Sequence, residues 1–247
     1  MKRNLSGKHV WLIGASTGIG RELARELARR GARLTVSARS VEQLNSLKEE
    51  IGDTVSVLPL DVSDQPAIAH AGETIEELDG VVFLAAAYNP DKLKELIPPD
   101  RIDQVVTVNL TGAMHVTQAV RRKLSGREDS FLALYASIAG YRGLPRGQPY
   151  SATKAGLINY AESLRTELRG KVDVKVINSG FVDTRITRQN DFRMPVLMKP
   201  EQAAVRIANG LERGGFEICF PKRFAYVVKL LRLLPNRIFF AISRKMV

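Results

Sequence analysis

Short runs of apolar, often β-branched residues alternate along the chain with segments of helical periodicity. The six runs expected to form strands are 9–14, 33–38, 56–61, 80–87, 130–137 and 173–180. Between the first two runs, residues 20–31 place Leu23 and Leu27 on one helix face and charges on the other, and residues 40–52 repeat this pattern. Continuous apolar strands separated by helices are typical of a parallel sheet with helices on both faces. The pattern predicts an α/β fold with a doubly wound, mostly parallel, Rossmann-like sheet.

Composition agrees with this interpretation and limits the number of domains. The chain has 247 residues, of which 45% are hydrophobic and 26% charged, without internal repeats or low-complexity tracts. No Pro- or Ser-rich linker divides it, so we expect residues 1–220 to form a single domain. The one cysteine, Cys219, argues against a disulfide framework and favours a reducing, cytoplasmic setting. The apolar run within residues 1–14 is too short for the core of a secretion signal and is expected to be a strand.

Positive charge is concentrated at one end of the chain. The formal net charge is +11, and residues 220–247 contain seven Lys or Arg and no Asp or Glu. The rest of the chain is only mildly basic, so no nucleic-acid partner is expected. Residues 221–247 are expected to form a basic amphipathic extension, too charged and too broken by Pro235 to span a bilayer. The extension either packs on the body or on an oligomer partner, or it lies on a membrane surface.

The glycine-rich stretch after the first strand fits two chemistries. Residues 14–18 match the G-x-S-x-G turn that presents Ser16 as the nucleophile of an α/β-hydrolase. That chemistry needs a histidine, usually late in the chain, and none of the three histidines lies in the C-terminal half. Alternatively, Gly14, Gly18 and Gly20 let backbone amides approach a pyrophosphate at the start of a helix. We interpret the stretch as a dinucleotide-binding loop.

The end of the second strand predicts which dinucleotide binds. An acidic residue there would accept hydrogen bonds from the ribose 2′-hydroxyl of NAD, whereas a basic residue accommodates the 2′-phosphate of NADP. The chain has Ala38 and Arg39 at this point and no acid. We therefore expect NADP, with NADPH preferred over NADH, and Ser37 and Ser40 as further phosphate donors. The alternative is that Arg39 is a solvated surface charge.

Four residues from three segments form the candidate catalytic set: Asn109, Ser137, Tyr150 and Lys154. Tyr150 and Lys154 are four residues apart, so on a helix they share a face. An ammonium group beside a phenol stabilises the phenolate and lowers a pKa that is ~10 in water. This pairing would make Tyr150 a usable acid and base.

The same four-residue spacing occurs at Tyr88 and Lys92. Pro90 lies between them and biases Asn89 away from helical geometry, so these two side chains are not expected to share a face. The spacing alone is therefore weak evidence, and the argument depends on its combination with Ser137 and the glycine loop.

With these motifs the chain resembles the short-chain dehydrogenase/reductase family, in its single-domain subgroup, over residues 7–220. The family's glycine motif falls on Gly14, Gly18 and Gly20, and its Asn-Ser-Tyr-Lys tetrad on Asn109, Ser137, Tyr150 and Lys154. The resemblance implies a metal-free, homodimeric or homotetrameric oxidoreductase that interconverts a carbonyl and an alcohol with a nicotinamide cofactor. It also implies Asp61 at the adenine and Thr184 at the carboxamide or phosphates. The residues expected to bind the cofactor are Gly14, Ser16, Thr17, Gly18, Ile19, Gly20, Arg39, Asp61, Val62, Ala85, Ala86, Ala87, Asn109, Tyr150, Lys154, Gly180, Val182 and Thr184.

The resemblance further implies a role for each residue of the tetrad. Tyr150 exchanges a proton with the substrate oxygen, and Ser137 holds that oxygen by a hydrogen bond. Lys154 binds the nicotinamide ribose and lowers the pKa of Tyr150. Asn109 helps to hold a water molecule that relays protons.

The chain departs from the family pattern at three places. Ile13 stands where threonine is usual, residues 84–87 read Leu-Ala-Ala-Ala in place of Asn-Asn-Ala-Gly, and Ser179 replaces a proline. At the first two places packing is expected to replace side-chain hydrogen bonds, with looser binding of adenosine as the consequence. A cofactor-binding regulator or scaffold without useful turnover is therefore an alternative function, against which the intact tetrad argues.

Two variable stretches, residues 140–149 and 185–200, are expected to determine the substrate. The apolar residues of the second stretch are Phe192, Met194, Pro195, Val196, Leu197 and Met198. They predict contacts with a lipid-like or other hydrophobic carbonyl or alcohol. The alternative is that these side chains simply pack within the protein.

Overall fold

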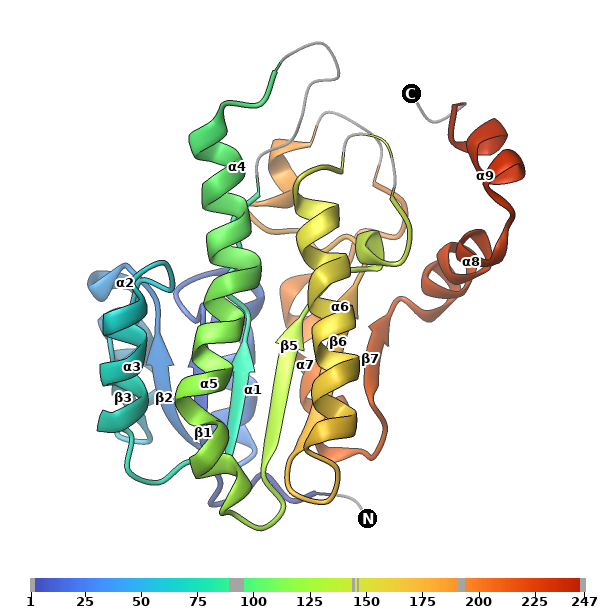
Figure 1. Cartoon of the computed structure of the whole chain (residues 1–247). Coiled ribbons are helices and arrows are strands. Elements are labelled where there is room, and N and C mark those ends of the chain that lie inside the picture. The colour runs from blue at the N-terminus through green and yellow to red at the C-terminus, as the bar shows by residue number, and fades with distance from the viewer. Residues whose placement is uncertain (1–2, 89–95, 144, 146, 191–193, 245–247) are drawn as a thin grey trace.

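Seven parallel strands form one sheet in the order β3-β2-β1-β4-β5-β6-β7 (Figure 1). The computed structural model describes residues 3–88, 96–143, 145, 147–190 and 194–244. The strands are β1 (His9–Ile13), β2 (Arg33–Ser37), β3 (Val55–Val57), β4 (Gly80–Phe83), β5 (Phe131–Tyr135), β6 (Asp173–Ser179) and β7 (Glu217–Phe220). The strand order reverses between β1 and β4, which opens a crevice beyond their carboxyl ends.

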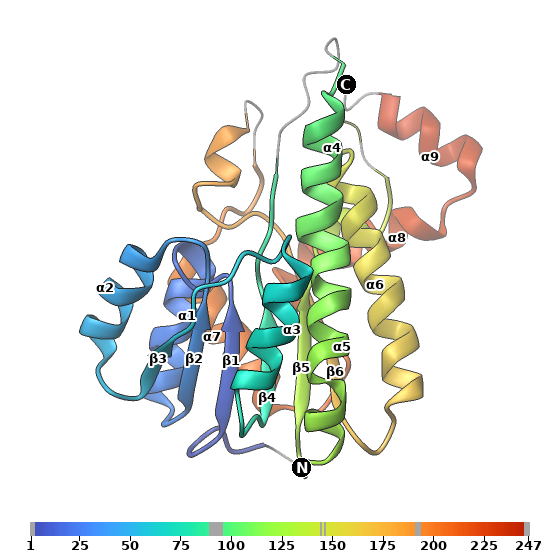
Figure 2. The same cartoon turned by 60° about the vertical axis from the view of Figure 1, so that its left-hand side comes forward.

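Helices cover both faces of the sheet, which confirms the predicted doubly wound α/β fold (Figures 1 and 2). One face carries α1 (Gly18–Arg29), α2 (Val41–Ile51) and α7 (Pro200–Glu212). The other face carries α3 (Gln65–Thr74), α5 (Gly112–Ser125) and α6 (Tyr150–Glu167), whereas α4 (Pro99–Val106) leads into α5 and projects beyond the carboxyl ends of the strands. The remaining helical segments are η1 (Thr107–Thr111), η2 (Ile138–Gly140), η3 (Thr187–Gln189), α8 (Lys222–Leu233) and α9 (Asn236–Ser243).

The central strands are buried on both faces, which explains their unbroken apolar sequences. In β1, Val10 and Leu12 pack into the core beneath α1, α2 and α7. Trp11 and Ile13 point the other way, into the core beneath α3, α5 and α6. None of the four side chains is more than 1% exposed. The two cores hold the strand ends from both sides and so give the site a rigid base.

The structure differs from the expected elements at the edges of the sheet. A strand is expected at residues 56–61, but β3 ends at Val57 and is only three residues long. The edge strand β7 is not predicted. In β7, Ile218 and Phe220 are buried, whereas Glu217 and Cys219 are partly exposed, so four residues carry too little pattern to indicate a strand. No helix in the described part of the chain is long and apolar enough to cross a membrane.

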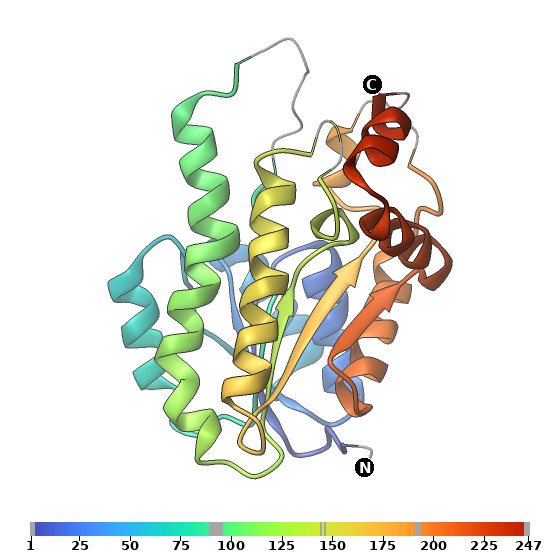
Figure 3. The ribbon, with the colours of Figure 1, turned by 45° about the vertical axis from the view of Figure 1, so that its right-hand side comes forward.

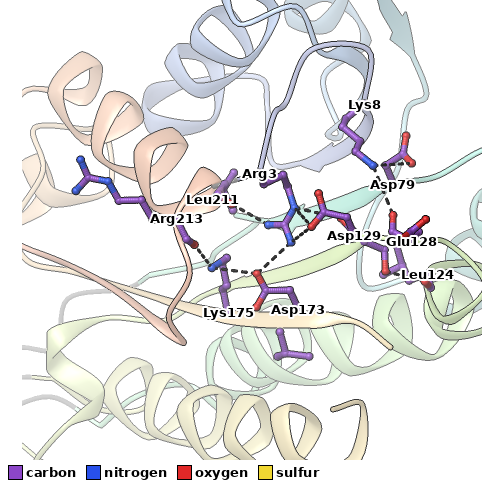
Figure 4. Close-up of polar contacts among 12 residues, drawn as sticks. Arg3, Lys8, Asp79, Leu124, Glu128, Asp129, Asp173, Lys175, Leu211 and Arg213 are labelled. Carbon is purple, nitrogen blue, oxygen red and sulfur yellow. Dashed lines mark hydrogen bonds and ion pairs between the residues drawn. The ribbon is translucent and has the colours of Figure 1, made fainter. Parts of the chain in front are cut away.

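An ion-pair network closes the end of the sheet opposite the crevice (Figure 4). Lys175 of β6 is fully buried; its Nζ donates to the backbone oxygen of Arg213 at 2.7 Å and lies 3.1 Å from Asp173. Arg3 also lies 3.1 Å from Asp173 and donates to the backbone oxygen of Leu211 at 2.7 Å. The network ties the start of the chain to β6 and to the segment before β7.

Asp173 is the acceptor that these cations share. Its burial would raise the pKa of its carboxyl group. The charges of Lys175 and Arg3, together with the hydrogen bond from Arg165, outweigh burial and hold that pKa below its usual value. The carboxylate therefore stabilises the folded chain.

Asp173→Asn should lower the free energy of unfolding at pH 7 by about 2–3 kcal/mol, because Lys175 and Arg3 lose their shared counter-charge. The loss is smaller than for a fully buried pair because the Asp173 side chain is 23% exposed. The folded pKa is lowered, so the stabilisation exists above the unfolded pKa of ~3.9 and is lost as the pH falls through the folded value. Urea unfolding should show the two proteins converging below that pH.

Asp129→Asn is the matched control. The Asp129 carboxylate also lies 3.0 Å from Arg3, but it is 47% exposed. Its loss should cost less than ~1 kcal/mol. Equal losses in the two variants, or a loss in Asp173→Asn that does not change with pH, would contradict this account of the network.

Candidate functional site

A cleft of about 970 Å³ lies beyond the carboxyl ends of β1, β4, β5 and β6. The predicted site residues that line it are Gly14, Ser16, Thr17, Gly18, Ile19, Gly20, Arg39, Asp61, Val62, Ala85, Ala86, Ala87, Ser137, Tyr150, Gly180, Val182 and Thr184. Asn109 and Lys154 do not line it and are both fully buried. The structure thus gathers residues from nearly the whole chain around one cleft.

The turn after β1 brings three backbone segments into close contact. Gly14 has φ +92°, and a Cβ on it would lie 2.6 Å from the backbone nitrogen of Ala85, just after β4. A Cβ on Gly20 would lie 2.0 Å from the carbonyl oxygen of Gly14. Only glycine permits these approaches. The N-cap residue Thr17 makes no side-chain cap bond, so the first N–H groups of α1 are available to an anion in the cleft.

Ser16 lines the same cleft, but no histidine does. His9 lies at the start of β1, where its Nε2 is 2.8 Å from Thr35 Oγ1. His70 and His115 are on α3 and α5. The hydrolase alternative therefore lacks its general base.

Arg39 lies in the cleft wall and is exposed. Within the described residues it makes no hydrogen bond or ion pair, so its guanidinium is uncommitted. Burial opposes ionisation of nearby Asp61, but hydrogen bonds from Ser63 and the charge of Arg39 leave the pKa of that carboxyl lowered. The Asp61 Oδ1 accepts from Ser63 N at 2.9 Å and from Ser63 Oγ at 2.7 Å. Among the described residues, this end of the cleft thus places the guanidinium of Arg39, which has no hydrogen-bond or ion-pair partner there, beside the Asp61 carboxylate that Ser63 partly engages.

Ser37 cannot serve a phosphate as expected. It is fully buried, and its Oγ accepts a hydrogen bond from Trp11 Nε1 at 2.8 Å. The prediction is wrong because the hydroxyl points into the sheet interior. Ser40 does line the cleft, where it caps α2 by accepting from Gln43 N at 3.3 Å.

Ile13 and Leu84 lie beside each other at the ends of β1 and β4, with their side chains packed in the cores on opposite faces of the sheet. They are 1% and 8% exposed, and Leu84 N donates to Ile13 O at 2.8 Å. Packing and a backbone hydrogen bond hold these two strand ends together, as expected from the apolar replacements. Looser binding of adenosine stays a prediction.

Asn109 lies in η1, a single π-helical turn between α4 and α5. Its Oδ1 accepts from Ala87 N at 2.7 Å, and its Nδ2 donates to Ala87 O at 3.0 Å and Thr153 Oγ1 at 3.1 Å. Both ends of the amide therefore hold Ala87, and Asn109 Nδ2 also joins this segment after β4 to Thr153 of α6. Asn109 acts here as a positioning residue, and its role with a water molecule stays a prediction.

Tyr150 and Lys154 share a face of α6, as their spacing predicts. Lys154 Nζ lies 5.4 Å from the centre of the Tyr150 ring and donates to Tyr135 O at 2.7 Å. Burial lowers the pKa of Lys154 to about 7. The lysine is therefore only partly charged at neutral pH.

Burial raises the pKa of Tyr150, and Tyr135 raises it further. The hydrogen bond with Ser137 lowers it in part, but the balance is opposite to the lowered pKa expected from the lysine. That expectation is wrong for this arrangement because Lys154 directs its hydrogen bond to Tyr135 and loses charge through its own burial. Tyr150 is accordingly a protonated acid at neutral pH.

Ser179 connects two residues of the site. Its Oγ lies 2.5 Å from the hydroxyl of Tyr135, and its carbonyl oxygen accepts from Ser137 Oγ at 3.3 Å. Burial raises the pKa of Tyr135 to about 12, although the hydrogen bond with Ser179 opposes this. At the position where the family usually has a proline, Ser179 holds the backbone through its hydrogen bonds with Tyr135 and Ser137.

The predicted apolar substrate residues do not line the cleft. Those that the structure describes are Met194, Pro195, Val196, Leu197 and Met198. Met198 is 7% exposed and forms a short parallel bridge with Val182 in the core. Val196 and Leu197 are 61% and 47% exposed. The prediction is wrong at these positions because the segment turns Met198 inward and the residues before it outward. Phe192 lies outside the described residues.

Aromatic side chains from other segments supply the lining. The rings of Tyr88 and Tyr150 meet edge-on with centroids 5.1 Å apart, and the Tyr88 hydroxyl donates to Asn190 Oδ1 at 2.5 Å. Phe181 and Phe224 also line the cleft, with ring centroids 6.1 Å apart.

Sequence reasoning missed these aromatic residues for different reasons. Tyr88 was considered only with Lys92, which lies outside the described residues. Phe181 directly follows Gly180, so its place after a strand end was a usable signal. Nothing in the sequence indicates that Phe224, from the C-terminal extension, reaches the cleft.

Comparison with known proteins places this geometry in a family. A model of the family described as short chain dehydrogenase matches residues 8–193. The chain belongs to the short-chain dehydrogenase/reductase family. As a member, it is an NAD(P)-dependent oxidoreductase acting on a CH–OH group or the corresponding carbonyl.

Individual relatives span most or all of the chain. An uncharacterized oxidoreductase of Myxococcus xanthus is 36% identical over 250 residues, covering 98% of each protein. The 3-oxoacyl-[acyl-carrier-protein] reductase of Escherichia coli is 30% identical over 75% of this chain and 78% of the relative. A crystal structure of a short-chain dehydrogenase from Burkholderia cenocepacia in complex with NADP has a TM-score of 0.86 at 22% identity, covering 99% of each chain. That structure has the same fold.

Lys154→Met should stabilise the protein without nucleotide at pH 7 by on the order of 2–4 kcal/mol. Protonated Lys154 is disfavoured by burial, since its pKa falls to about 7. This cost is full below the folded pKa and disappears as the pH rises to the unfolded pKa of ~10.4. Urea unfolding should therefore show a gain at pH 7 that shrinks steadily toward pH ~10.

Lys171→Met tests the same change at an exposed lysine and should show no such pH-dependent gain. A Lys154→Met protein that is less stable than wild type at pH 7, or a gain unchanged by pH, would rule out the burial cost.

Proposed function

We propose that this oxidoreductase uses NADP(H) to interconvert a hydrophobic carbonyl compound and its alcohol, with Tyr150 as acid and base. The observation that carries the proposal is a single cleft lined by the glycine loop and Arg39 as well as by Ser137 and Tyr150. Its volume of about 970 Å³ is at the upper end for ligand pockets, which suits a dinucleotide beside a substrate.

The groups present fit a dinucleotide with a 2′-phosphate. The open N-terminal turn of α1 suits the pyrophosphate, and the uncommitted guanidinium of Arg39 suits a further phosphate. When bound, the nicotinamide supplies the hydride in reduction and accepts it in oxidation. A structural neighbour in complex with NADP agrees with this choice.

Tyr150 performs the proton transfer. It is protonated at neutral pH because burial raises its pKa, so in reduction it donates its phenolic proton to the substrate oxygen. In oxidation the phenolate takes the proton back. Ser137, which is hydrogen-bonded with Tyr150, holds the same oxygen. Lys154, 5.4 Å from the ring centre, gains stabilisation when the phenolate forms.

The cleft favours an apolar substrate through Tyr88, Phe181 and Phe224 rather than through residues 194–198. The regulator or scaffold alternative is favoured by the apolar Ile13 and by Ala85, and it would show nucleotide binding without turnover. We also propose a cytoplasmic homodimer or homotetramer whose C-terminal extension contacts a membrane.

Arg39→Ala should weaken NADPH binding by about 10- to 100-fold, because a charged hydrogen bond to phosphate is worth ~1.5–3 kcal/mol. NADH binding should change by less than about twofold, since it has no 2′-phosphate. Titration followed by nicotinamide fluorescence measures both. Lys48→Ala, on the same side of the molecule but outside the cleft lining, is the control and should bind both nucleotides as wild type does. Equal losses for NADPH and NADH would show that Arg39 does not read the phosphate.

Tyr150→Phe should lower kcat by at least ~100-fold because the general acid is gone, while NADPH binding changes little. With wild type, a series of straight-chain aldehydes should show kcat/KM rising by up to about fourfold for each added CH₂. Turnover limited to small polar carbonyls would contradict the hydrophobic substrate. Tight NADPH binding with no turnover of any carbonyl would favour the regulator instead.

A further inference from the structure

Helix α8 has an apolar face on each side. Ala225 and Val228 are buried against the body. On the other side Tyr226, Leu230 and Leu233 follow one another at i, i+4 and i+7 and are 61%, 63% and 79% exposed. Helices that only cover a core carry polar residues on their outer side. The outer face of α8 is thus unpartnered apolar surface.

Helix α9 extends this surface. Phe239 is buried, whereas Ile238, Phe240 and Ile242 are at least 37% exposed. Figure 3 shows α8 and α9 beyond the carboxyl end of β7, with no other element of the described chain in front of them. We call the exposed apolar side chains of these two helices the α8–α9 surface.

Polar contacts hold both helices in a defined position. Lys229 of α8 forms an ion pair with Glu217 of β7, and Glu217 also accepts from Tyr141, which follows η2. Arg142 donates to Asn236 Oδ1 at 2.6 Å. The guanidinium of Arg142 also lies 4.3 Å from the centre of the Phe239 ring. The α8–α9 surface is therefore a fixed feature of the fold and faces outward.

Charge decides what can cover this surface. The exposed cations of the same segment are Lys222, Arg223, Arg232, Arg237 and Arg244. Residues 220–247 contain no acid. A second copy packed through the same patch would set these cations against each other without a carboxylate from the segment to neutralise them. Exposed apolar side chains and cations on the same helices are complementary to anionic lipid.

We propose that the α8–α9 surface binds the surface of an anionic lipid bilayer, with its apolar side chains at the level of the lipid headgroups. Each Lys or Arg near such a surface strengthens binding roughly fivefold at moderate salt. Several together with the apolar side chains are sufficient for reversible peripheral association.

The same extension reaches the cleft. Phe224 of α8 lines the cleft and lies next to Gly180, where a Cβ atom would be 3.4 Å from the Phe224 ring. A bilayer held by α8 and α9 is therefore next to the wall that Phe224 and Phe181 provide. If the proposed function holds, the substrate is a carbonyl or alcohol dissolved in the membrane, which enters beside α8.

Flotation of the full-length protein with vesicles tests the proposal. Wild type should float with vesicles of phosphatidylcholine and phosphatidylglycerol and remain below with phosphatidylcholine alone. Leu230→Glu/Leu233→Glu should reduce the floated fraction at least about fivefold, because it places negative charge on the bound face. Val205→Glu is the matched control, since Val205 is an apolar residue 41% exposed on α7, and it should float as wild type does.

A second measurement does not depend on a variant. Raising the salt from about 0.1 to 0.5 M should release wild type from the anionic vesicles, because screening shortens the reach of the cations. Failure of wild type to float, or equal flotation of both Glu variants, overturns the proposal. If wild type does not bind vesicles and Leu230→Glu/Leu233→Glu forms a smaller oligomer than wild type in solution, the surface is a subunit interface instead.

Kinetics separate the docking surface from the proposed activity. Anionic vesicles should raise turnover of a long-chain aldehyde and leave that of a short water-soluble aldehyde unchanged. Flotation without any turnover would retain the docking surface and reject the activity. Turnover that vesicles do not change would reject entry from the membrane.

Discussion

The backbone contact between the turn after β1 and the start of α1 is the constraint on which the cleft depends. Because Gly20 has no side chain, α1 begins against the carbonyl of Gly14. The same turn brings Gly14 against the backbone of Ala85. One backbone arrangement therefore aims the N-terminus of α1 into the crevice and fixes the spacing of β1 and β4. Apolar Ile13 and Leu84 pack in separate cores and are joined by a backbone hydrogen bond, so these strand ends need no polar side chains to hold them together.

Chemistry at the other end of the cleft depends on burying polar groups. Lys154 and Asn109 are fully buried. Lys154 donates to the backbone oxygen of Tyr135, and Asn109 bonds both the N–H and the carbonyl of Ala87. Burial keeps Tyr150 protonated and brings Lys154 close to neutrality. Such groups lower the stability of the folded chain, which is a common feature of active sites. The two cores and the Asp173 network supply rigidity away from the cleft.

The C-terminal extension joins the two aspects of the molecule. Its inner side completes the cleft through Phe224, while its outer side is apolar and basic. Glu217 links these sides, because it binds Lys229 of α8 and Tyr141, which follows the segment carrying Ser137. The position of α8 is thus coupled to the loop beside the catalytic residues. Substrate access and surface attachment would then be served by the same two short helices.

The sequence by itself determined the α/β class and the glycine loop, because strand burial and helix periodicity are local patterns. The spacing of Tyr150 and Lys154 likewise placed them on one helix face, while the catalytic roles of Asn109, Ser137, Tyr150 and Lys154 stay predictions. The place of Arg39 in the cleft was also predictable, because it directly follows the second predicted strand. Only the tertiary structure decided that Ser37 faces inward and that Met198 joins the core. It also decided the raised pKa of Tyr150 and the reach of Phe224 into the cleft. These properties depend on burial by segments far apart in the chain, which no local pattern encodes.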